Sequence, residues 1–218
     1  MPITSDYVVY VDYDGTITDQ DTFYALARDG GGPLRWRQLE ESLAAGQMEL
    51  REVLSAQARA MRLSLDEADA LLAQSVKFDS TFSAFVAACE QRGVALAILS
   101  SGVAPLIGRA LGRQGLSRVQ ILASEVVVEP TGWIFQHRDA SANGHDKAAA
   151  VRAAQAAGKR VVFVGDGLSD YAAAQAADRC FAKRGRALER FLGERGVQFT
   201  PFDTFAQIQT ALFASAAD

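Results

Sequence analysis

Short apolar runs recur along the chain and indicate where strands are expected. The first covers residues 8–11 and is followed by Asp12 and Asp14, after which Gly15 lets the backbone turn sharply. Continuous apolar runs bounded by turn residues are typical of strands buried on both faces of a sheet. We therefore predict strands over 8–11, 94–99, 119–123 and 161–164, with shorter ones near 180–182 and 197–199.

Between these runs the apolar positions follow a helical period. Phe82, Phe85, Val86 and Cys89 fall on one face of a helix that Gly93 ends. The alternation of strands and helices predicts an α/β fold with a doubly wound parallel sheet. Further helices are expected over 105–113 and 146–157 and from 169, 186 and 203 onward, with a β-hairpin over 126–136.

The stretch between the first two expected strands has a helical pattern throughout. A helix can start at Asp21, the glycine and proline run at 30–33 breaks the chain as a candidate hinge, and Ser64 with Glu67 forms a capping box. We predict a small α-helical cap at 21–77, inserted into an α/β core made of 1–20 and 78–218.

Composition and charge exclude several classes of protein. The 218 residues, 49% of them hydrophobic, suffice for one sizeable core and a small second module. A net charge of −4 gives no electrostatic footprint for nucleic acid or an acidic membrane surface. Cys89 and Cys180 lie in apolar segments and are expected to be reduced and buried, and we find neither a signal peptide nor a membrane-spanning run. These features predict a cytoplasmic protein.

Candidate chemistry begins at the first strand. Two carboxylates, Asp12 and Asp14, at the carboxyl end of a buried strand are costly to place unless they act on something. The alternative is that Asp14, Gly15 and Thr16 form only a turn with a helix cap behind it.

Two further polar sites occupy the same context at strand ends. Ser100, Ser101 and Gly102 offer hydroxyls and backbone N–H groups suited to phosphate oxygens, although Ser there can also be a helix N-cap. Lys147 stands at a helix start, where a cation opposes the helix dipole, which indicates an anionic partner unless it is an ordinary surface lysine.

The segment Gly165-Asp166-Gly167-Leu168-Ser169-Asp170 adds two carboxylates after the 161–164 strand. Asp166 alone could be a turn residue and Asp170 alone a helix-dipole partner. Together with Asp12 and Asp14, they would repel one another unless they were protonated or neutralised by a metal. Oxygen ligands without histidine or cysteine favour Mg²⁺.

These motifs, in this order, resemble those of the haloacid dehalogenase superfamily, specifically its Mg²⁺-dependent aspartyl-phosphate phosphatases. The inserted helices look like the small cap of the phosphoserine-phosphatase-like branch. The segments 178–183 and 200–205 look most like those of methionine-salvage phosphatases, which dephosphorylate a hydroxy-keto-methylthiopentenyl phosphate. The resemblance implies a phosphomonoester hydrolase acting on a small phosphorylated metabolite through an aspartyl-phosphate.

The resemblance also implies residue roles. Asp12 would be the nucleophile, and Asp14 would protonate the leaving alcohol and then deprotonate water. Asp12, Asp166 and the backbone carbonyl of Asp14 would bind Mg²⁺, with Asp170 close behind. The phosphate would be held by Ser100, Ser101, Gly102 and Lys147.

Specificity is the least determined property. Asp21 matches a substrate-binding acid of phosphoserine phosphatases, but the pattern favours a helix N-cap before Thr22. Arg51 could bind a carboxylate bidentately or lie on a solvated helix face. Ser101 departs from the second glycine that close relatives often carry, which could crowd the phosphate. No metabolite follows from these residues.

Other functions on the same fold remain as alternatives. A dehalogenase would lack Asp14, and a phosphonatase would need a cap lysine, whereas no lysine occurs over 34–76. A phosphotransferase or mutase of the superfamily and a non-catalytic small-molecule or phosphate-binding protein stay open. We expect a monomer or a homodimer that binds neither nucleic acid nor membrane.

Overall fold

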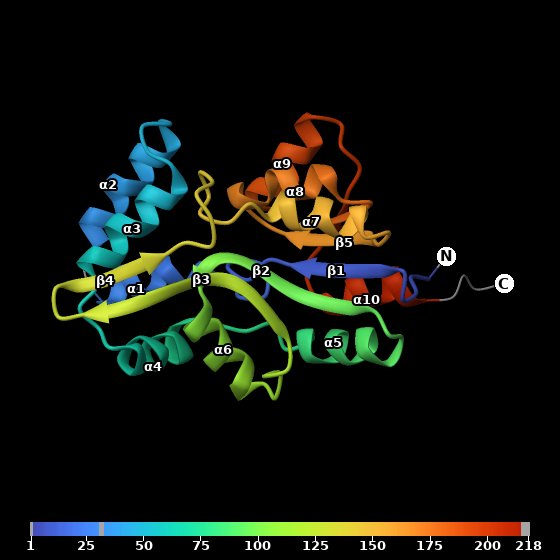
Figure 1. The fold of residues 1–218 in the computed structure, drawn as a ribbon, viewed down its shortest axis with the longest axis horizontal. Helices are drawn as coiled ribbons and strands as arrows, with labels where there is room; N and C mark the ends of the chain where they lie inside the picture. The colour runs from blue at the N-terminus through green and yellow to red at the C-terminus, as the bar shows by residue number, and fades with distance from the viewer. Residues whose placement is uncertain (1, 31–32, 215–218) are drawn as a thin grey trace. The chain divides into compact units, whose positions relative to one another are not determined.

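The computed structural model describes residues 2–30 and 33–214 and contains one seven-stranded sheet in the order β4-β3-β2-β1-β5-β6-β7 (Figure 1). β1 (Tyr7–Val11) pairs in parallel with β2 (Ala95–Val103) and with β5 (Arg160–Gly165). β6 (Arg179–Lys183) pairs in parallel with β5 and with β7 (Thr200–Phe202). The prediction of an α/β fold with a mostly parallel sheet is confirmed.

The described residues divide into two compact units. The first consists of residues 2–17, 78–99 and 147–214, and the second of 18–77 and 100–146 apart from 31–32. The second unit therefore joins the inserted helices to a β-hairpin segment, a grouping that the sequence did not indicate. The division into a core of 1–20 and 78–218 and a cap of 21–77 stays a prediction.

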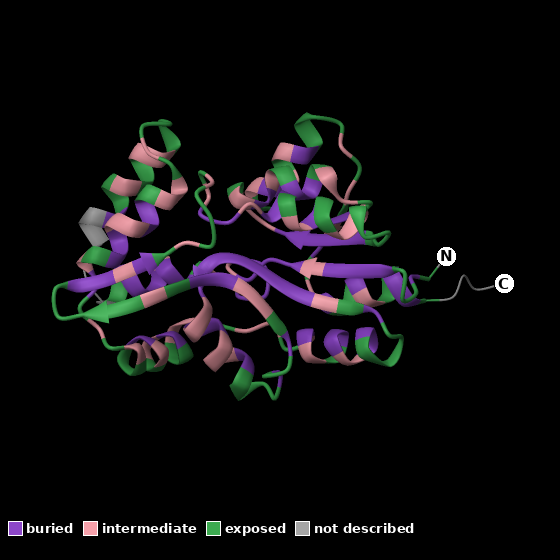
Figure 2. Cartoon of the chain, viewed as in Figure 1, coloured by how far each residue is buried: buried purple, intermediate pink, exposed green. Residues whose placement is uncertain are grey.

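The first unit is a parallel sheet with helices on both faces. Figure 1 shows α7, α8 and α9 over one face of β1 and β5, with α5 and α10 on the other. Residues 161–164 of β5 are fully buried, because this strand is covered on both faces (Figure 2). The helical elements of this unit are α5 (Phe82–Gln91), α7 (Lys147–Ala156), the 3₁₀ turn η1 (Leu168–Asp170), α8 (Tyr171–Ala176), α9 (Ala187–Glu194) and α10 (Phe205–Phe213).

The second unit packs helices on an antiparallel hairpin of β3 (Gln120–Glu129) and β4 (Gly132–Gln136). Trp133 of β4 is completely buried, and its indole N–H donates to the Leu63 carbonyl at 2.7 Å. Ser64 and Glu67 form the predicted capping box at the start of α4. The helices of this unit are α1 (Thr22–Gly30), α2 (Pro33–Ala44), α3 (Leu50–Ala60), α4 (Leu65–Ser75) and α6 (Ala104–Arg113).

Three strand boundaries differ from the prediction. β2 continues to Val103, four residues beyond 94–99, so the Ser100 segment is extended strand and not a loop. β3 is one strand over 120–129, where two separate segments were expected. The last strand is β7 at 200–202, so the prediction of 197–199 was wrong. Of the candidate hinge at 30–33, residues 31–32 lie outside the described residues, while Gly30 ends α1 and Pro33 begins α2.

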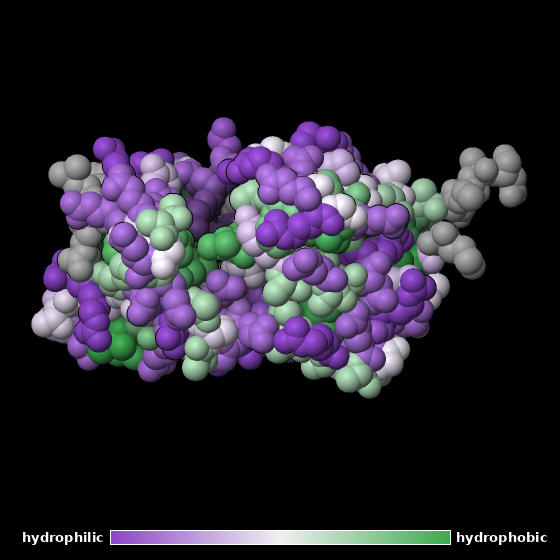
Figure 3. Space-filling view, turned by 90° about the horizontal axis from the view of Figure 1, so that it is seen from above, coloured by the Kyte–Doolittle hydropathy of each residue, from purple (hydrophilic) through white to green (hydrophobic). Residues whose placement is uncertain are grey.

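The surface in the view of Figure 3 carries mostly hydrophilic residues with smaller apolar areas between them. Both cysteines are buried and free, as expected, and burial raises the pKa of each thiol to about 12. Within residues 2–30 and 33–214, no helix combines the length and apolar character needed to cross a bilayer.

Candidate active site

Asp12 is the first residue after β1, and its backbone is tied to the neighbouring strand. Its N–H donates to the Val164 carbonyl of β5 at 2.8 Å, and the residue is 4% exposed. The hydroxyl of Thr16, itself fully buried, donates to Asp12 Oδ2 at 3.3 Å. The turn after the strand therefore folds back on the carboxylate. Asp14 lies half-buried in this turn.

Lys147, the first residue of α7, is 1% exposed and neutralises part of the charge around Asp12. Its Nζ lies 2.5 Å from Asp12 Oδ1, 2.7 Å from Asp170 Oδ1 and 3.1 Å from Ser169 Oγ. Burial alone would lower the pKa of Lys147, but the charges of Asp12 and Asp170 outweigh it and raise that pKa. The lysine is thus a buried, permanently charged ammonium.

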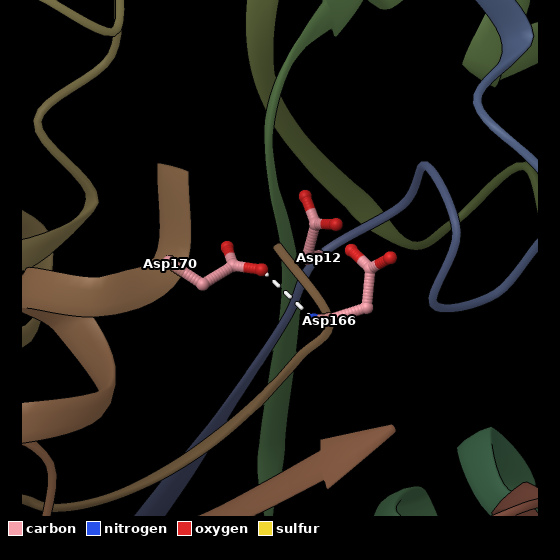
Figure 4. A group of neighbouring side chains, drawn as sticks. All are labelled: Asp12, Asp166 and Asp170. Atoms are coloured by element: carbon pink, nitrogen blue, oxygen red, sulfur yellow. Dashed lines mark hydrogen bonds between the residues drawn. The ribbon is translucent and has the colours of Figure 1, made fainter. Parts of the chain in front are cut away.

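The loop after β5 is shaped by Asp170, which is fully buried. Asp170 Oδ2 accepts hydrogen bonds from the backbone N–H groups of Asp166 and Gly167 at 2.9 and 3.0 Å. Figure 4 shows the bond to Asp166, whose carboxylate lies beside that of Asp12. Since Asp170 Oδ1 accepts from Lys147, both oxygens of this carboxylate are engaged within the protein.

Three carboxylates converge at this edge of the sheet. One oxygen each from Asp12, Asp166 and Asp170 lies within 4.8 Å of the others. Burial raises the pKa of Asp12 well above its usual range, and the negative charge of Asp170 adds to this, while Lys147 opposes it. One ammonium does not compensate this cluster. Its oxygen donors and negative charge fit a hard divalent cation.

Gly15 provides the space that this cluster needs. Its φ is +74°, and a Cβ placed on it would lie 2.2 Å from Asp166 Oδ2. A side chain at position 15 would therefore displace Asp166. The glycine that was expected only to allow a turn also gives room to a carboxylate.

Ser100, Ser101 and Gly102 belong to the second unit and lie in the final residues of β2. Ser100 Oγ accepts the N–H of Gly102 at 2.9 Å, and the Ser100 carbonyl accepts the Nδ1–H of His145 at 3.1 Å. Ser101 is 9% exposed, and among the described residues its hydroxyl has no hydrogen-bond partner. A buried, unsatisfied hydroxyl of this kind can donate to an anionic ligand.

The two candidate specificity residues make structural contacts in the second unit. Asp21 Oδ1 accepts the N–H of Tyr24 at 2.8 Å, which is helix N-capping at the start of α1. Arg51 donates to the Ala140 carbonyl at 3.1 Å and to Glu49 at 3.2 Å. Their roles in specificity stay predictions.

Two residues near these segments were not anticipated. Lys183, the last residue of β6, donates to the Thr16 carbonyl at 3.3 Å, and burial lowers the pKa of its ammonium. His145 is 5% exposed and holds the Ser100 carbonyl. A polar residue at a strand end was the available indication for Lys183, but its partner is a backbone atom that no sequence pattern specifies.

The fold and the acidic strand-end site define a class of protein, the Rossmann-like hydrolases with a carboxylate cluster at the sheet edge. Residues 9–175 match the family of haloacid dehalogenase-like hydrolases, and the chain belongs to this family. The prediction of a hydrolase of this superfamily is confirmed, and the phosphatases among its relatives support the predicted phosphatase class.

Similar proteins span nearly the whole chain. Pdp3-interacting factor 1 of Schizosaccharomyces pombe is 34% identical, over 94% of this chain and 93% of its own. Polyol phosphate phosphatase PYP1 of Saccharomyces cerevisiae is 27% identical, over 94% and 92%. A 2-hydroxy-3-keto-5-methylthiopentenyl-1-phosphate phosphatase of Geobacillus kaustophilus is 27% identical, over 96% and 97%. The predicted likeness to methionine-salvage phosphatases is therefore confirmed.

A solved structure described as a phospho-aspartyl intermediate analogue of phosphoserine phosphatase has the same fold. It superposes with a TM-score of 0.71 at 14% identity and covers 94% of this chain and 98% of its own. At this identity the likeness shows the fold alone.

Proposed function

We propose that the protein is a Mg²⁺-dependent phosphomonoester hydrolase that acts on a small phosphorylated metabolite through a phosphorylated Asp12. The observation that carries the proposal is the buried Asp12–Lys147–Asp170 chain, with Asp166 beside Asp12. Such a costly concentration of charge needs compensation by a ligand. A divalent cation supplies this positive charge, and it can hold the oxygens of a phosphoryl group as well.

Asp12 is the nucleophile. Its carboxylate oxygen forms a bond to phosphorus while the bond from phosphorus to the ester oxygen breaks, and Asp14 gives its proton to the departing alcohol. Asp14 then takes a proton from water, whose oxygen attacks phosphorus. The bond to Asp12 breaks, and inorganic phosphate leaves. Thr16 and Lys147 orient the Asp12 carboxylate through their hydrogen bonds.

The carboxylates of Asp12 and Asp166, with the backbone carbonyl of Asp14, are the proposed holders of Mg²⁺. Asp170 instead positions the loop, since its Oδ2 accepts the backbone N–H groups of Asp166 and Gly167 and its Oδ1 accepts from Lys147. When bound, the cation supplies positive charge that neutralises the phosphate and favours the ionised form of Asp12. Oxygen-only donors support Mg²⁺ over zinc.

Lys147, Ser100, Ser101 and Gly102 are the proposed phosphate ligands. The buried ammonium of Lys147 offers a fixed positive charge, and the Ser101 hydroxyl offers a donor with no competing partner among the described residues. Fixed donors of this kind stabilise the charge that builds up on phosphoryl oxygens in the transition state.

The substrate class we infer is a phosphomonoester of a small hydroxylated or keto metabolite. The support is the relatives' names, which specify a polyol phosphate and a 2-hydroxy-3-keto-5-methylthiopentenyl-1-phosphate. Both names describe a phosphorylated compound that also carries hydroxyl groups.

The deciding experiment is phosphate release from an aryl phosphate, phosphoserine and a polyol phosphate, with Mg²⁺ and with a chelator. Metal-dependent release is expected from at least one ester. Asp14→Asn should slow the hydrolysis of alkyl phosphates far more than that of the aryl phosphate, because the aryl leaving group needs no proton. Asp203→Asn, a change of an exposed carboxylate, is the control. A folded protein that releases no phosphate but binds it would instead be a phosphate-binding protein. Transfer of the phosphoryl group to a second alcohol instead of water would identify a phosphotransferase.

A further inference from the structure

The turn that follows β1 is held by hydrogen bonds within itself and to the rest of the first unit. Inside the turn, the N–H groups of Thr16 and Ile17 both donate to the Tyr13 carbonyl, at 3.3 and 3.0 Å. The Thr16 hydroxyl reaches back to Asp12 Oδ2 at 3.3 Å. The Thr16 carbonyl accepts from Lys183 Nζ at 3.3 Å. Thr16 thus links a lysine of β6 to the proposed nucleophile.

Lys183 is well placed to act as a fixed anchor. It is the last residue of β6, in register with Phe202 of the edge strand β7, and its ammonium lies 5.1 Å from the centre of the Phe202 ring. The aromatic face attracts the cation, and the half-buried stem loses rotamer freedom. Its contact with a backbone carbonyl means that the side chain of residue 16 does not determine the bond.

We propose that Lys183 is a positioning residue, which holds the turn of residues 13–17 through the Thr16 carbonyl and so sets where Asp14 meets the leaving group. Because the bond ends on a backbone atom, Lys183 controls the path of the turn itself and acts on Asp14 only through that path.

This inference rests on the proposed function, because it assigns Lys183 to the proton-transfer half of that reaction. Asp12 is independently held by β5 and Lys147, and the Ile17 carbonyl at the end of the turn accepts the N–H of Asp79 at 2.8 Å. Lys183 holds the segment between these two fixed ends. Loss of the anchor should therefore disturb this middle segment more than Asp12. A misplacement of about 1 Å can cost on the order of a hundredfold in rate.

The test compares Lys183→Met with the matched control Lys159→Met. Lys159 also donates to a backbone carbonyl of the same unit, that of Ser5 at 2.9 Å, but at the opposite end of β1. In Lys183→Met, kcat for an alkyl phosphate should fall by roughly ten- to hundredfold with KM changed less, and the aryl phosphate should lose far less. Lys159→Met should keep the wild-type ratio of alkyl to aryl rates.

A second variant and a second readout keep the inference testable. Lys183→Arg retains a cationic donor and should recover part of the alkyl rate; if Lys183→Met does not fold, Lys183→Arg should still show a smaller bias against the alkyl ester. The rate of amide hydrogen exchange at Thr16 and Ile17 should rise in Lys183→Met and stay unchanged in Lys159→Met.

Equal losses for both esters, or unchanged exchange at Thr16 and Ile17, would overturn the inference. The exchange measurement needs no turnover. An inactive wild-type protein whose turn still loosens in Lys183→Met would therefore refute the hydrolase proposal and support the anchor.

Discussion

The surroundings of Asp12 disfavour the ionised form of its carboxylate. Burial first, and then the neighbouring carboxylates, raise its pKa, while Lys147 only partly compensates. A function that requires an ionised Asp12 therefore conflicts with the stability of the metal-free protein. Unfavourable electrostatics of this kind are typical of active sites, where residues that serve reactivity lower the stability of the fold.

Replacing Asp12 by Asn should separate activity from stability. Asp12→Asn keeps the shape but removes the charge and the nucleophile, so turnover should fall by about a thousandfold or more, while the metal-free melting temperature should equal or exceed that of the wild type. Phosphate release and thermal unfolding in chelator measure the two effects.

The matched control is Asp178→Asn, at the opposite end of the sheet. Asp178 Oδ2 accepts the N–H of Val161 at 2.7 Å, so this change should lower stability modestly and leave kcat unchanged. Wild-type turnover in Asp12→Asn would refute the role of Asp12.

At this scale the sequence identified the acidic residues but not their partners. Asp12, Asp166 and Asp170 are predicted because they follow apolar runs, and Lys147 because it stands at a helix start. The structure brings these four side chains together. Hydrogen-bond partners such as the backbone carbonyl that accepts from Lys183 depend on tertiary placement, which sequence spacing does not encode.

At the scale of the element, the turn after β1 depends on the missing side chain of Gly15. Gly15→Ala meets a positive φ of +74° and a contact with Asp166 Oδ2, whereas Gly158, at φ +81°, has nothing within 4 Å of its added Cβ. Both substitutions should cost about 1–3 kcal/mol of backbone strain. Only Gly15→Ala should also lower turnover and weaken Mg²⁺ binding. Urea unfolding and Mg²⁺ titration of both variants test this, and equal activity in the two would contradict it.

A pH-sensitive contact in the second unit joins Ser55 of α3 to His137, the residue directly after β4. The Ser55 hydroxyl donates to the Arg51 carbonyl at 2.9 Å, so His137 Nε2 must be the donor in its 2.8 Å contact with Ser55 Oγ. His137 Nδ1 is buried and, within the described part of the chain, has no partner. Burial, and then the charge of Arg51, lower the pKa of His137, while Asp139 opposes this.

The sign of the pH effect follows from that direction. Between the folded-state pKa and about 6.5, the unfolded chain binds more protons at His137 than the folded chain, so stability falls as pH falls through this window. His137→Gln keeps an N–H donor without a titrating ring. Urea unfolding from about pH 7 to about pH 5 should show a steeper loss for the wild type than for His137→Gln, and parallel slopes would rule out the contribution.

Strand boundaries show where sequence patterns lose information. Residues 200–202 contain Pro201, which argues against a strand in general but is tolerated in an edge strand such as β7. The apolar residues of 197–199 instead follow the end of α9, where the Val197 N–H donates to the Leu192 carbonyl. β2 extends through Ser100 and Ser101 because pairing and burial, rather than hydrophobicity, define its end.

At the scale of the whole molecule, a chain with net charge −4 concentrates three carboxylates at one sheet edge, and the proposed Mg²⁺ would balance their charge. The alternation of strands and helices was sufficient to predict the α/β class, because it follows from local periodicity. The grouping of 100–146 with the inserted helices was not predictable, since it depends on contacts between segments far apart in sequence.

Mg²⁺ should therefore stabilise the fold as well as the reaction. A ligand that binds only the native state at a hundred times its Kd adds about 2.7 kcal/mol, which for a chain of this size raises Tm by roughly 5–10 °C. Asp166→Asn removes a proposed ligand and keeps Asp170, which accepts the N–H groups of the loop, so the Tm of this variant should no longer respond to Mg²⁺. Asp178→Asn should respond as the wild type does. Thermal unfolding across a Mg²⁺ series, with chelator as the zero point, measures this. If the Tm of Asp166→Asn rose with Mg²⁺ as much as that of the wild type, the cation would bind elsewhere, because the loss of a ligand must weaken binding at the acidic cluster.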